Sequence, residues 1–200
     1  MAYRLVIFDF DDTLLHLDVD WKAVKADIVK LAHDAGVKVD ESQNLVHMGN
    51  RLSAHHGLKA GVDGVYLKHE LICAKSRSYK PFMPMLAIAR ELKSKGMRLG
   101  IASGNHTDSI KRILSDLGML DAFDIICGRD ATPRSKPAPD QLLLIMEKTG
   151  VKNGDVIFVG DSMHDQLSAK AAGIFLFLVH PNSSFDAARL RHELGLPKAD

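Results

Sequence analysis

From residue 81 onward, short apolar runs alternate with segments in which apolar residues recur at the spacing of a helix. The runs predict strands over residues 97–102, 124–127, 156–159 and 174–179. Helices are predicted over residues 84–96, 108–117, 139–149, 164–172 and 185–194. Strands that alternate with helices of about ten to fifteen residues predict a parallel sheet covered by helices on both faces.

The first strand of this sheet is predicted over residues 5–10, and a stretch without strands separates it from the others. Three helices are predicted in that stretch, over residues 21–35, 40–57 and 62–75. We therefore predict an α/β fold with a doubly wound parallel sheet. Residues 1–15 and 82–200 would form a Rossmann-like core, and residues 16–81 a small all-helical cap. Because such sheets bind ligands at the carboxyl ends of their strands, the cap would hang over the site.

Composition excludes several classes of protein. The chain of 200 residues is 46% hydrophobic and 26% charged, as ordinary globular domains are. Its net charge of +1 gives no field that would favour nucleic acid or an acidic membrane surface. Asp9 interrupts the apolar run near the N-terminus, which is then too short for a signal peptide or a membrane span. The two widely separated cysteines, Cys73 and Cys127, suit a reducing compartment, and we expect a cytoplasmic protein.

A cluster of acids follows the first predicted strand. In an extended chain, Asp9 and Asp11 point the same way and can face one pocket. Two close carboxylates repel, so that one becomes protonated or a cation is bound between them. A protonated acid and a magnesium site are both useful in catalysis. The alternative is that these acids only cap a turn or lie in a solvated loop.

A second acidic pair, Asp161 and Asp165, follows the strand predicted at residues 156–159. Asp165 falls in a first helical turn, where the helix dipole favours an acid in any case. That explanation does not extend to Asp161, which lies only one residue beyond the apolar strand. Magnesium prefers oxygen ligands and keeps several waters, so two or three carboxylates are enough to hold it.

Two further segments could hold a phosphate group among these acids. Ser103, Gly104 and Asn105 offer a hydroxyl and exposed backbone N–H groups just before a predicted helix. Lys136 offers an ammonium group in a loop stiffened by two prolines. A lysine taken alone is more often a solvated surface residue, and only its position relative to the other clusters favours a role here.

Taken together, the four clusters resemble the haloacid dehalogenase-like hydrolase superfamily. The resemblance covers residues 5–13, 101–105, 136–139 and 156–173, in the order and at the strand ends typical of that superfamily. The helical insertion resembles its type-one cap, and the phosphoglycolate-phosphatase-like branch is the most similar in pattern. Asp12 stands where glycine is common, although aspartate also occurs there.

The resemblance implies a magnesium-dependent phosphatase that acts on a small phosphate ester. Asp9 would attack phosphorus and form an aspartyl-phosphate, and Asp11 would protonate the leaving oxygen and then activate water. Ser103 would hold phosphoryl oxygens, and Lys136 would neutralise charge. The implied phosphate-binding set is Asp12, Ser103, Gly104, Asn105 and Lys136. The implied Mg²⁺ ligands are Asp9, Asp11 through its carbonyl, Asp161 and Asp165.

The same branch points to 2-phosphoglycolate as a substrate, whose carboxylate would need a cation from the cap. Arg51 is the preferred candidate because its guanidinium can bind a carboxylate with two hydrogen bonds. A sugar-phosphate or nucleotide phosphatase and a phosphomutase stay open as alternatives. No nucleic-acid or membrane partner is expected, and the sequence does not indicate an oligomeric state.

Three other interpretations are weaker. A metal-independent dehalogenase of the same superfamily would lack the second acid of the first cluster, and Asp11 is present. A receiver-like phospho-acceptor combines similar residues but has no helical insertion after its first strand, and its Lys-Pro pair follows the last strand. Lys136-Pro137 precedes two further predicted strands. A catalytically idle binding module would not be expected to retain the whole set of acids, serine and lysine.

Overall fold

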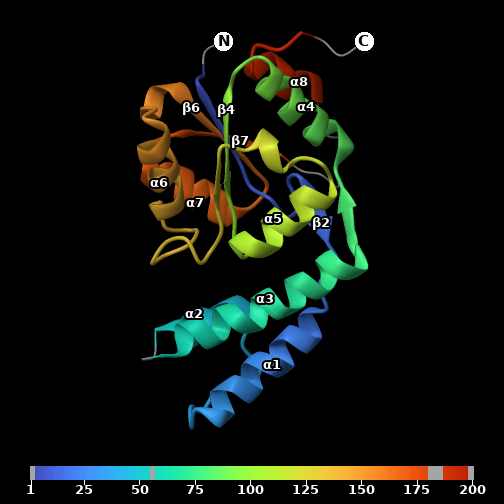
Figure 1. Ribbon diagram of the computed structural model, residues 1–200. Helices are drawn as coiled ribbons and strands as arrows, with labels where there is room; N and C mark the ends of the chain where they lie inside the picture. The colour runs from blue at the N-terminus through green and yellow to red at the C-terminus, as the bar shows by residue number, and fades with distance from the viewer. Residues whose placement is uncertain (1–2, 55–56, 180–186, 198–200) are drawn as a thin grey trace.

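The computed structural model describes residues 3–54, 57–179 and 187–197, and its centre is a five-stranded parallel sheet (Figure 1). The strand order is β5-β4-β1-β6-β7. The strands are β1 (Leu5–Phe8), β4 (Arg98–Ala102), β5 (Ile125–Cys127), β6 (Val156–Gly160) and β7 (Phe175–Leu178). Because β1 lies in the middle, its carboxyl end is flanked by the ends of β4 and β6. The predicted α/β fold with a doubly wound parallel sheet is confirmed.

Helices cover both faces of the sheet because successive side chains of its strands point in opposite directions. Leu5 and Ile7 of β1 pack into one buried cluster, and Val6 and Phe8 pack into another. The first cluster includes α6 (Asp140–Thr149) and α7 (Met163–Ala172). The second includes α4 (Met83–Ser94), α5 (Thr107–Asp116) and α8 (Ala187–Glu193). Residues 185–186 of the predicted last helix lie outside the described residues.

Two short strands, which the sequence analysis did not predict, connect the sheet to the helical insertion. β2 (Leu15–Leu17) and β3 (Tyr79–Pro81) pair antiparallel, with His16 opposite Lys80. We expected three helices and no strand in this stretch, and that expectation was wrong at its two ends. Three-residue strands leave no periodic pattern, and the partners are distant in sequence, so no local signal marks them.

The insertion itself contains α1 (Trp21–Asp34), α2 (Leu45–Ser53) and α3 (Leu58–Ser76). α2 begins five residues later than predicted, because Asn44 rather than Asp40 is its N-cap and accepts a hydrogen bond from the His47 backbone at 2.8 Å. α3 begins four residues earlier than the predicted Val62. Apolar side chains of α1 and α2, such as Val24, Ile28 and Leu52, are fully buried and hold the three helices together.

In Figure 1 the insertion lies below the core, with α3 facing α5, and these two helices are in contact. In the described part of the chain, the remaining regular elements are two single-turn 3₁₀ helices, Leu120–Ala122 and Asn153–Asp155. Within the described residues, no helix has both the length and the hydrophobicity that a membrane span requires.

Candidate active site

Asp9 follows directly on β1 and is held by the sheet. Its backbone N–H donates to the carbonyl of Val159 in β6 at 2.8 Å, and its side chain is almost fully buried. Burial raises the pKa of the Asp9 carboxyl, and the neighbouring Lys136 ammonium opposes that rise. A buried carboxylate therefore stands at the end of the central strand.

Lys136 lies between two carboxylates. Its Nζ atom is 2.7 Å from Oδ1 of Asp9 and 2.6 Å from Oδ1 of Asp165, and its side chain is buried. Burial disfavours the ammonium form, but the two carboxylates more than offset this and keep the pKa of Lys136 above its ordinary value. Lys136 is thus a buried cation beside Asp9, not a solvated surface lysine.

Asp165 is fixed by the turn between β6 and α7. Its Oδ2 atom accepts hydrogen bonds from the backbone and hydroxyl of Ser162, at 3.0 and 2.6 Å. Ser162 in turn accepts from the Asp165 backbone, which completes a capping box. Gly160 leaves room for this arrangement, because a Cβ atom there would lie 2.7 Å from Cγ of Asp165. The acid in the first helical turn therefore caps the helix and also binds Lys136.

Asp9, Asp161 and Asp165 fit a divalent cation. Each offers a carboxylate oxygen, and these atoms lie within 4.8 Å of one another. Three carboxylates with one ammonium leave two negative charges unbalanced. Burial and the nearby Asp165 raise the pKa of Asp161. Buried carboxylates in such a group suit Mg²⁺, which prefers oxygen ligands.

Asp11 lies beside Asp9 on the wall of the cavity. Burial raises the pKa of its carboxyl to about 6, although a 2.8 Å hydrogen bond from the Leu17 backbone opposes the rise. A carboxyl with this pKa exchanges its proton near neutral pH. Asp11 is therefore equipped to donate and accept a proton.

The structure does not bring Asp12 to the cavity. Its backbone N–H donates to the carbonyl of Leu15 at 2.7 Å, and its carboxylate lies 2.7 Å from Nδ1 of His16. Its φ of 58° explains the preference for glycine at this position, since only a few side chains tolerate that conformation. Both groups are therefore already engaged, and the role of Asp12 in binding phosphate stays a prediction.

Ser103, Gly104 and Asn105 form the loop between β4 and α5. This loop is called the phosphate loop below, after the role that the sequence predicts for it. Ser103 is buried, and its Oγ atom donates to Oδ1 of Asn105 at 3.0 Å and accepts from the Asn105 backbone at 3.1 Å. Gly104 is exposed to the cavity, and a Cβ atom added to it would meet no other atom within 4 Å. A hydroxyl and an uncovered backbone thus lie on the same wall as Asp9.

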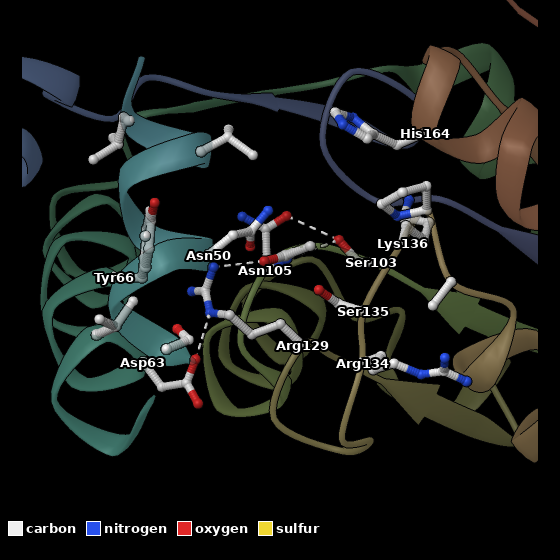
Figure 2. Close-up of a pocket in the computed structure, with 18 of the residues that line it drawn as sticks. Asn50, Asp63, Tyr66, Ser103, Asn105, Arg129, Arg134, Ser135, Lys136 and His164 are labelled. Atoms are coloured by element: carbon white, nitrogen blue, oxygen red, sulfur yellow. Dashed lines mark hydrogen bonds and ion pairs between the residues drawn. The ribbon is translucent and has the colours of Figure 1, made fainter. Parts of the chain in front are cut away.

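A cavity of about 1250 Å³ joins these residues to the helical insertion. The core contributes Asp9, Asp11, Ser103 and Lys136, and the insertion contributes Trp21, Asn50 and Tyr66. Figure 2 shows Lys136 and Ser103 on the core wall, opposite Asn50 and Tyr66. Each of the four predicted segments therefore contributes residues to one space, the segment 156–173 through Ser162 and His164. Asp12, Asp161 and Asp165 are not among the lining residues.

The lysines and arginines that line the cavity each have an acidic partner. These pairs are Lys59–Asp63, Arg129–Glu70, Arg134–Asp140 and Lys136–Asp9. Arg51 is not among the lining residues: it is exposed, and its guanidinium donates to the carbonyl of Lys38 at 3.2 Å. Near the insertion side of the cavity, Lys59 is the more accessible cation, with 44% of its side chain exposed against 13% for Arg129.

Three residues that support the site were missed in the sequence analysis. Gln141 is fully buried, and its amide donates to the carbonyls of Ser103 and Cys127 at 2.8 and 2.9 Å. Glu70 and Arg129 form a buried ion pair between α3 and the loop after β5. A glutamine or glutamate on a predicted helix gives no sign of burial, and a loop arginine gives no sign of its partner, so no signal marked them.

The fold and the site define the class of this protein: an α/β protein with a cluster of carboxylates and one lysine at the carboxyl ends of parallel strands. The model of the haloacid dehalogenase-like hydrolase family matches residues 6–179. A phosphoglycolate phosphatase from Yersinia pseudotuberculosis is 34% identical over 184 residues, which is 86% of this chain and 78% of the relative. The chain therefore belongs to the haloacid dehalogenase-like hydrolase family, as the sequence resemblance predicted.

A second sequence relative is matched over a smaller part of its length, and two solved structures are similar in fold. A phosphoglycolate phosphatase from Escherichia coli is 38% identical over 82 residues, 41% of this chain, and the match spans only about a third (32%) of that relative's length. CbbY from Rhodobacter sphaeroides, in complex with phosphate, superposes with a TM-score of 0.69 at 18% identity over 93% of this chain and 91% of that one. A haloacid dehalogenase-like hydrolase from Bacteroides fragilis superposes with a TM-score of 0.65 at 22% identity, over 98% of this chain and 95% of that one.

Proposed function

We propose that this protein is a Mg²⁺-dependent phosphomonoester hydrolase that acts on a small organic phosphate. The observation that carries the proposal is the buried Lys136 ammonium between Asp9 and Asp165, with Ser103 and Asp11 on the same cavity wall. A dianionic phosphate group needs positive charge and N–H or O–H donors, and a nucleophile must reach phosphorus in line with the leaving oxygen. The cavity supplies both kinds of group.

In the first step, a carboxylate oxygen of Asp9 forms a bond to phosphorus while the bond from phosphorus to the ester oxygen breaks. Asp11 gives its proton to that oxygen, so that an alcohol leaves and an aspartyl-phosphate stays on the protein. Lys136 offsets the negative charge of Asp9 and of the phosphate, which would otherwise repel each other. Ser103 and the exposed backbone of Gly104 orient the other phosphoryl oxygens.

In the second step, the ionised Asp11 takes a proton from a water molecule, and the oxygen of that water attacks phosphorus. The bond between phosphorus and Asp9 breaks, which releases inorganic phosphate and restores both carboxyl groups. The raised pKa of Asp11 suits this double role, because the same group must be an acid first and a base afterwards.

Asp9, Asp161 and Asp165 would hold the magnesium ion. The resemblance to the family adds the carbonyl of Asp11 as a further oxygen ligand. When bound, the ion would neutralise charge on the phosphate and lower the energy of the transition state. Asp9 and Asp165 also keep Lys136 in place, since removing both would leave a buried ammonium without a partner.

We further propose that residues 16–81 act as a cap that limits the size of the substrate. The insertion forms one wall of the cavity, through Trp21, Asn50 and Tyr66, which favours a small ester over a folded phosphoprotein. The relatives named above make 2-phosphoglycolate the first ester to test. Lys59, which lines the cavity in a half-exposed pair with Asp63, replaces Arg51 as the candidate partner of its carboxylate.

The test is turnover by the purified protein. Release of inorganic phosphate from 2-phosphoglycolate, several sugar phosphates and p-nitrophenyl phosphate is measured with and without Mg²⁺, and with Asp9→Asn as the control for contaminating phosphatase. We expect Mg²⁺-dependent hydrolysis of at least one small ester by the unchanged protein only. Equal phosphate release by the unchanged protein and by Asp9→Asn would refute the proposal.

A further inference from the structure

Glu70 is a carboxylate of the insertion whose hydrogen-bond partners all belong to the core. It lies on α3 and is 1% exposed. Its Oε2 atom accepts from the backbone of His106 at 2.9 Å and from the hydroxyl of Ser109 at 2.5 Å, and Oε1 accepts from Arg129. A buried carboxylate is stable only when it is compensated in this way. Moving α3 away from α5 would break all three contacts at once.

Arg129 carries the contact from Glu70 to the phosphate loop. Its Nη1 atom donates to the carbonyl of Gly104 at 2.6 Å, and its backbone N–H donates to the carbonyl of Asn105 at 2.9 Å. On the insertion side, the guanidinium lies 4.4 Å from the ring centre of Tyr66, and Nε is 3.7 Å from Asp63. Figure 2 shows the side chain extended between Asp63 and Tyr66 on one side and Asn105 on the other.

The packing beneath the phosphate loop leaves little freedom for it to adjust alone. A Cβ atom at Gly128 would lie 2.3 Å from the backbone nitrogen of Thr107 and 2.6 Å from the carbonyl of Asn105. The segment that carries Arg129 therefore lies directly against the phosphate loop and the start of α5. Glu70 binds both neighbours of the phosphate loop, namely Arg129 on one side and the first residues of α5 on the other.

We infer that Glu70 and Arg129 are positioning residues that order the phosphate loop when the insertion closes on the core. The inference rests on the proposed function, because the proposed function assigns phosphate binding to this loop. With the insertion closed, Glu70 neutralises Arg129, and Arg129 holds the Gly104 carbonyl, which fixes the side of the loop opposite Ser103. With the insertion open, Arg129 loses this carboxylate, and the backbone N–H of His106 loses its acceptor. Closure and a geometry that binds phosphate are then favoured together.

The experiment compares Glu70→Gln with Asp27→Asn, a matched control. Asp27 is also a carboxylate with two basic partners, Lys68 and His69, but all three lie within the insertion. The readouts are kcat and KM for p-nitrophenyl phosphate, inhibition by orthovanadate, and hydrogen exchange at the backbone amide of Asn105. That amide donates to Ser103 Oγ and does not contact Glu70, so its exchange reports on the loop itself.

We expect Glu70→Gln to raise KM and the orthovanadate inhibition constant by about tenfold, the effect of losing one hydrogen bond to a charged group. Hydrogen exchange at the Asn105 backbone amide should quicken in parallel. The double variant Glu70→Gln with Arg129→Gln should lose less free energy of orthovanadate binding than the sum of the losses in the two single variants. Asp27→Asn should leave all of these readouts unchanged. If Glu70→Gln does not fold, Arg129→Lys provides the same comparison, because lysine cannot reach Gly104 and Glu70 in the same fork.

The inference fails if Glu70→Gln lowers thermal stability as Asp27→Asn does but leaves KM, orthovanadate inhibition and Asn105 exchange unchanged. In that case the pair is only a structural tie between two parts of the protein. Hydrogen exchange needs no substrate, so it tests the inference even if the unchanged protein hydrolyses none of the esters, an outcome that would refute the proposed function separately.

Discussion

The Nζ atom of Lys136 lies 2.7 Å from Oδ1 of Asp9, and the same nitrogen is held on its other side by Asp165. This arrangement predicts that Asp9→Asn folds, because Lys136 keeps one carboxylate partner and the amide has nearly the shape of the acid. Turnover should be lost, since an amide oxygen is a poor nucleophile toward phosphorus. Thermal unfolding and phosphate release measure the two effects. Near-normal turnover by Asp9→Asn would exclude Asp9 as the nucleophile.

Asp11→Asn should slow hydrolysis by on the order of 10²–10⁴-fold, the usual contribution of general acid–base catalysis. The loss should depend on the leaving group. An alkyl ester such as 2-phosphoglycolate needs its leaving oxygen protonated, whereas p-nitrophenolate leaves more readily without a proton. The ratio of kcat/KM for the two substrates should therefore shift toward p-nitrophenyl phosphate in the variant. An unchanged ratio would argue against Asp11 as the acid.

Removal of metal with EDTA should abolish turnover, and added Mg²⁺ should restore it. Ca²⁺ should not, because its larger and less regular coordination shell spoils in-line geometry. Asp161→Asn should raise the Mg²⁺ concentration needed for half-maximal activity, since it removes a ligand without touching Lys136. A titration of activity against Mg²⁺ measures this shift. Full activity of the EDTA-treated protein would instead favour a metal-independent reaction.

Lys59→Met should raise KM for 2-phosphoglycolate roughly two- to fivefold, the size of one partly screened charge contact. KM for p-nitrophenyl phosphate, which has no carboxylate, should not change. Arg51→Met is the matched control, because Arg51 carries the same charge on the same insertion but does not line the cavity. Equal effects of the two substitutions would mean that Lys59 acts only through long-range charge.

Gly160→Ala should destabilise the protein by about 1–3 kcal/mol, the usual cost of forcing a methyl group into a tightly packed site. The new Cβ would lie 2.7 Å from Cγ of Asp165, which is itself held by Ser162 and Lys136 and cannot move freely. Gly64→Ala is the control. Gly64 lies inside α3, and a Cβ atom there would meet no atom within 4 Å beyond the backbone of its own helix, so the substitution should stabilise the helix by roughly 0.5–1 kcal/mol. Chemical denaturation measures both changes.

The strand ends and their acids could be predicted from sequence because each signal is local. An apolar run that ends at Asp9 or just before Asp161 shows both the strand and the edge of the sheet where ligands bind. Lys136 was placed only by the order of the clusters, since nothing local separates a buried lysine from an exposed one. Its two carboxylate partners become visible only when the strands are side by side.

The supporting residues could not be predicted because their role depends on distant contacts. Glu70 resembles any helical glutamate until α3 lies on α5, and Gln141 shows no sign that it bonds two strand-end carbonyls. Arg51 was preferred for its chemistry alone, and the start of α2 at Leu45 rather than Asp40 shows how loosely the sequence defines that helix. Side-chain direction in the insertion depends on such boundaries.

The pairing of β2 with β3 also has a consequence for how this protein can diversify. Because Leu15 lies opposite Pro81, the chain leaves the core and returns to it at neighbouring points. Everything between these points is topologically one long hairpin loop, whatever its length. A genetic insertion, deletion or exchange there would leave the strand order and the carboxylate cluster in place, so the cavity wall that faces the substrate and the contacts of Glu70 with the core would be exchanged together as one module.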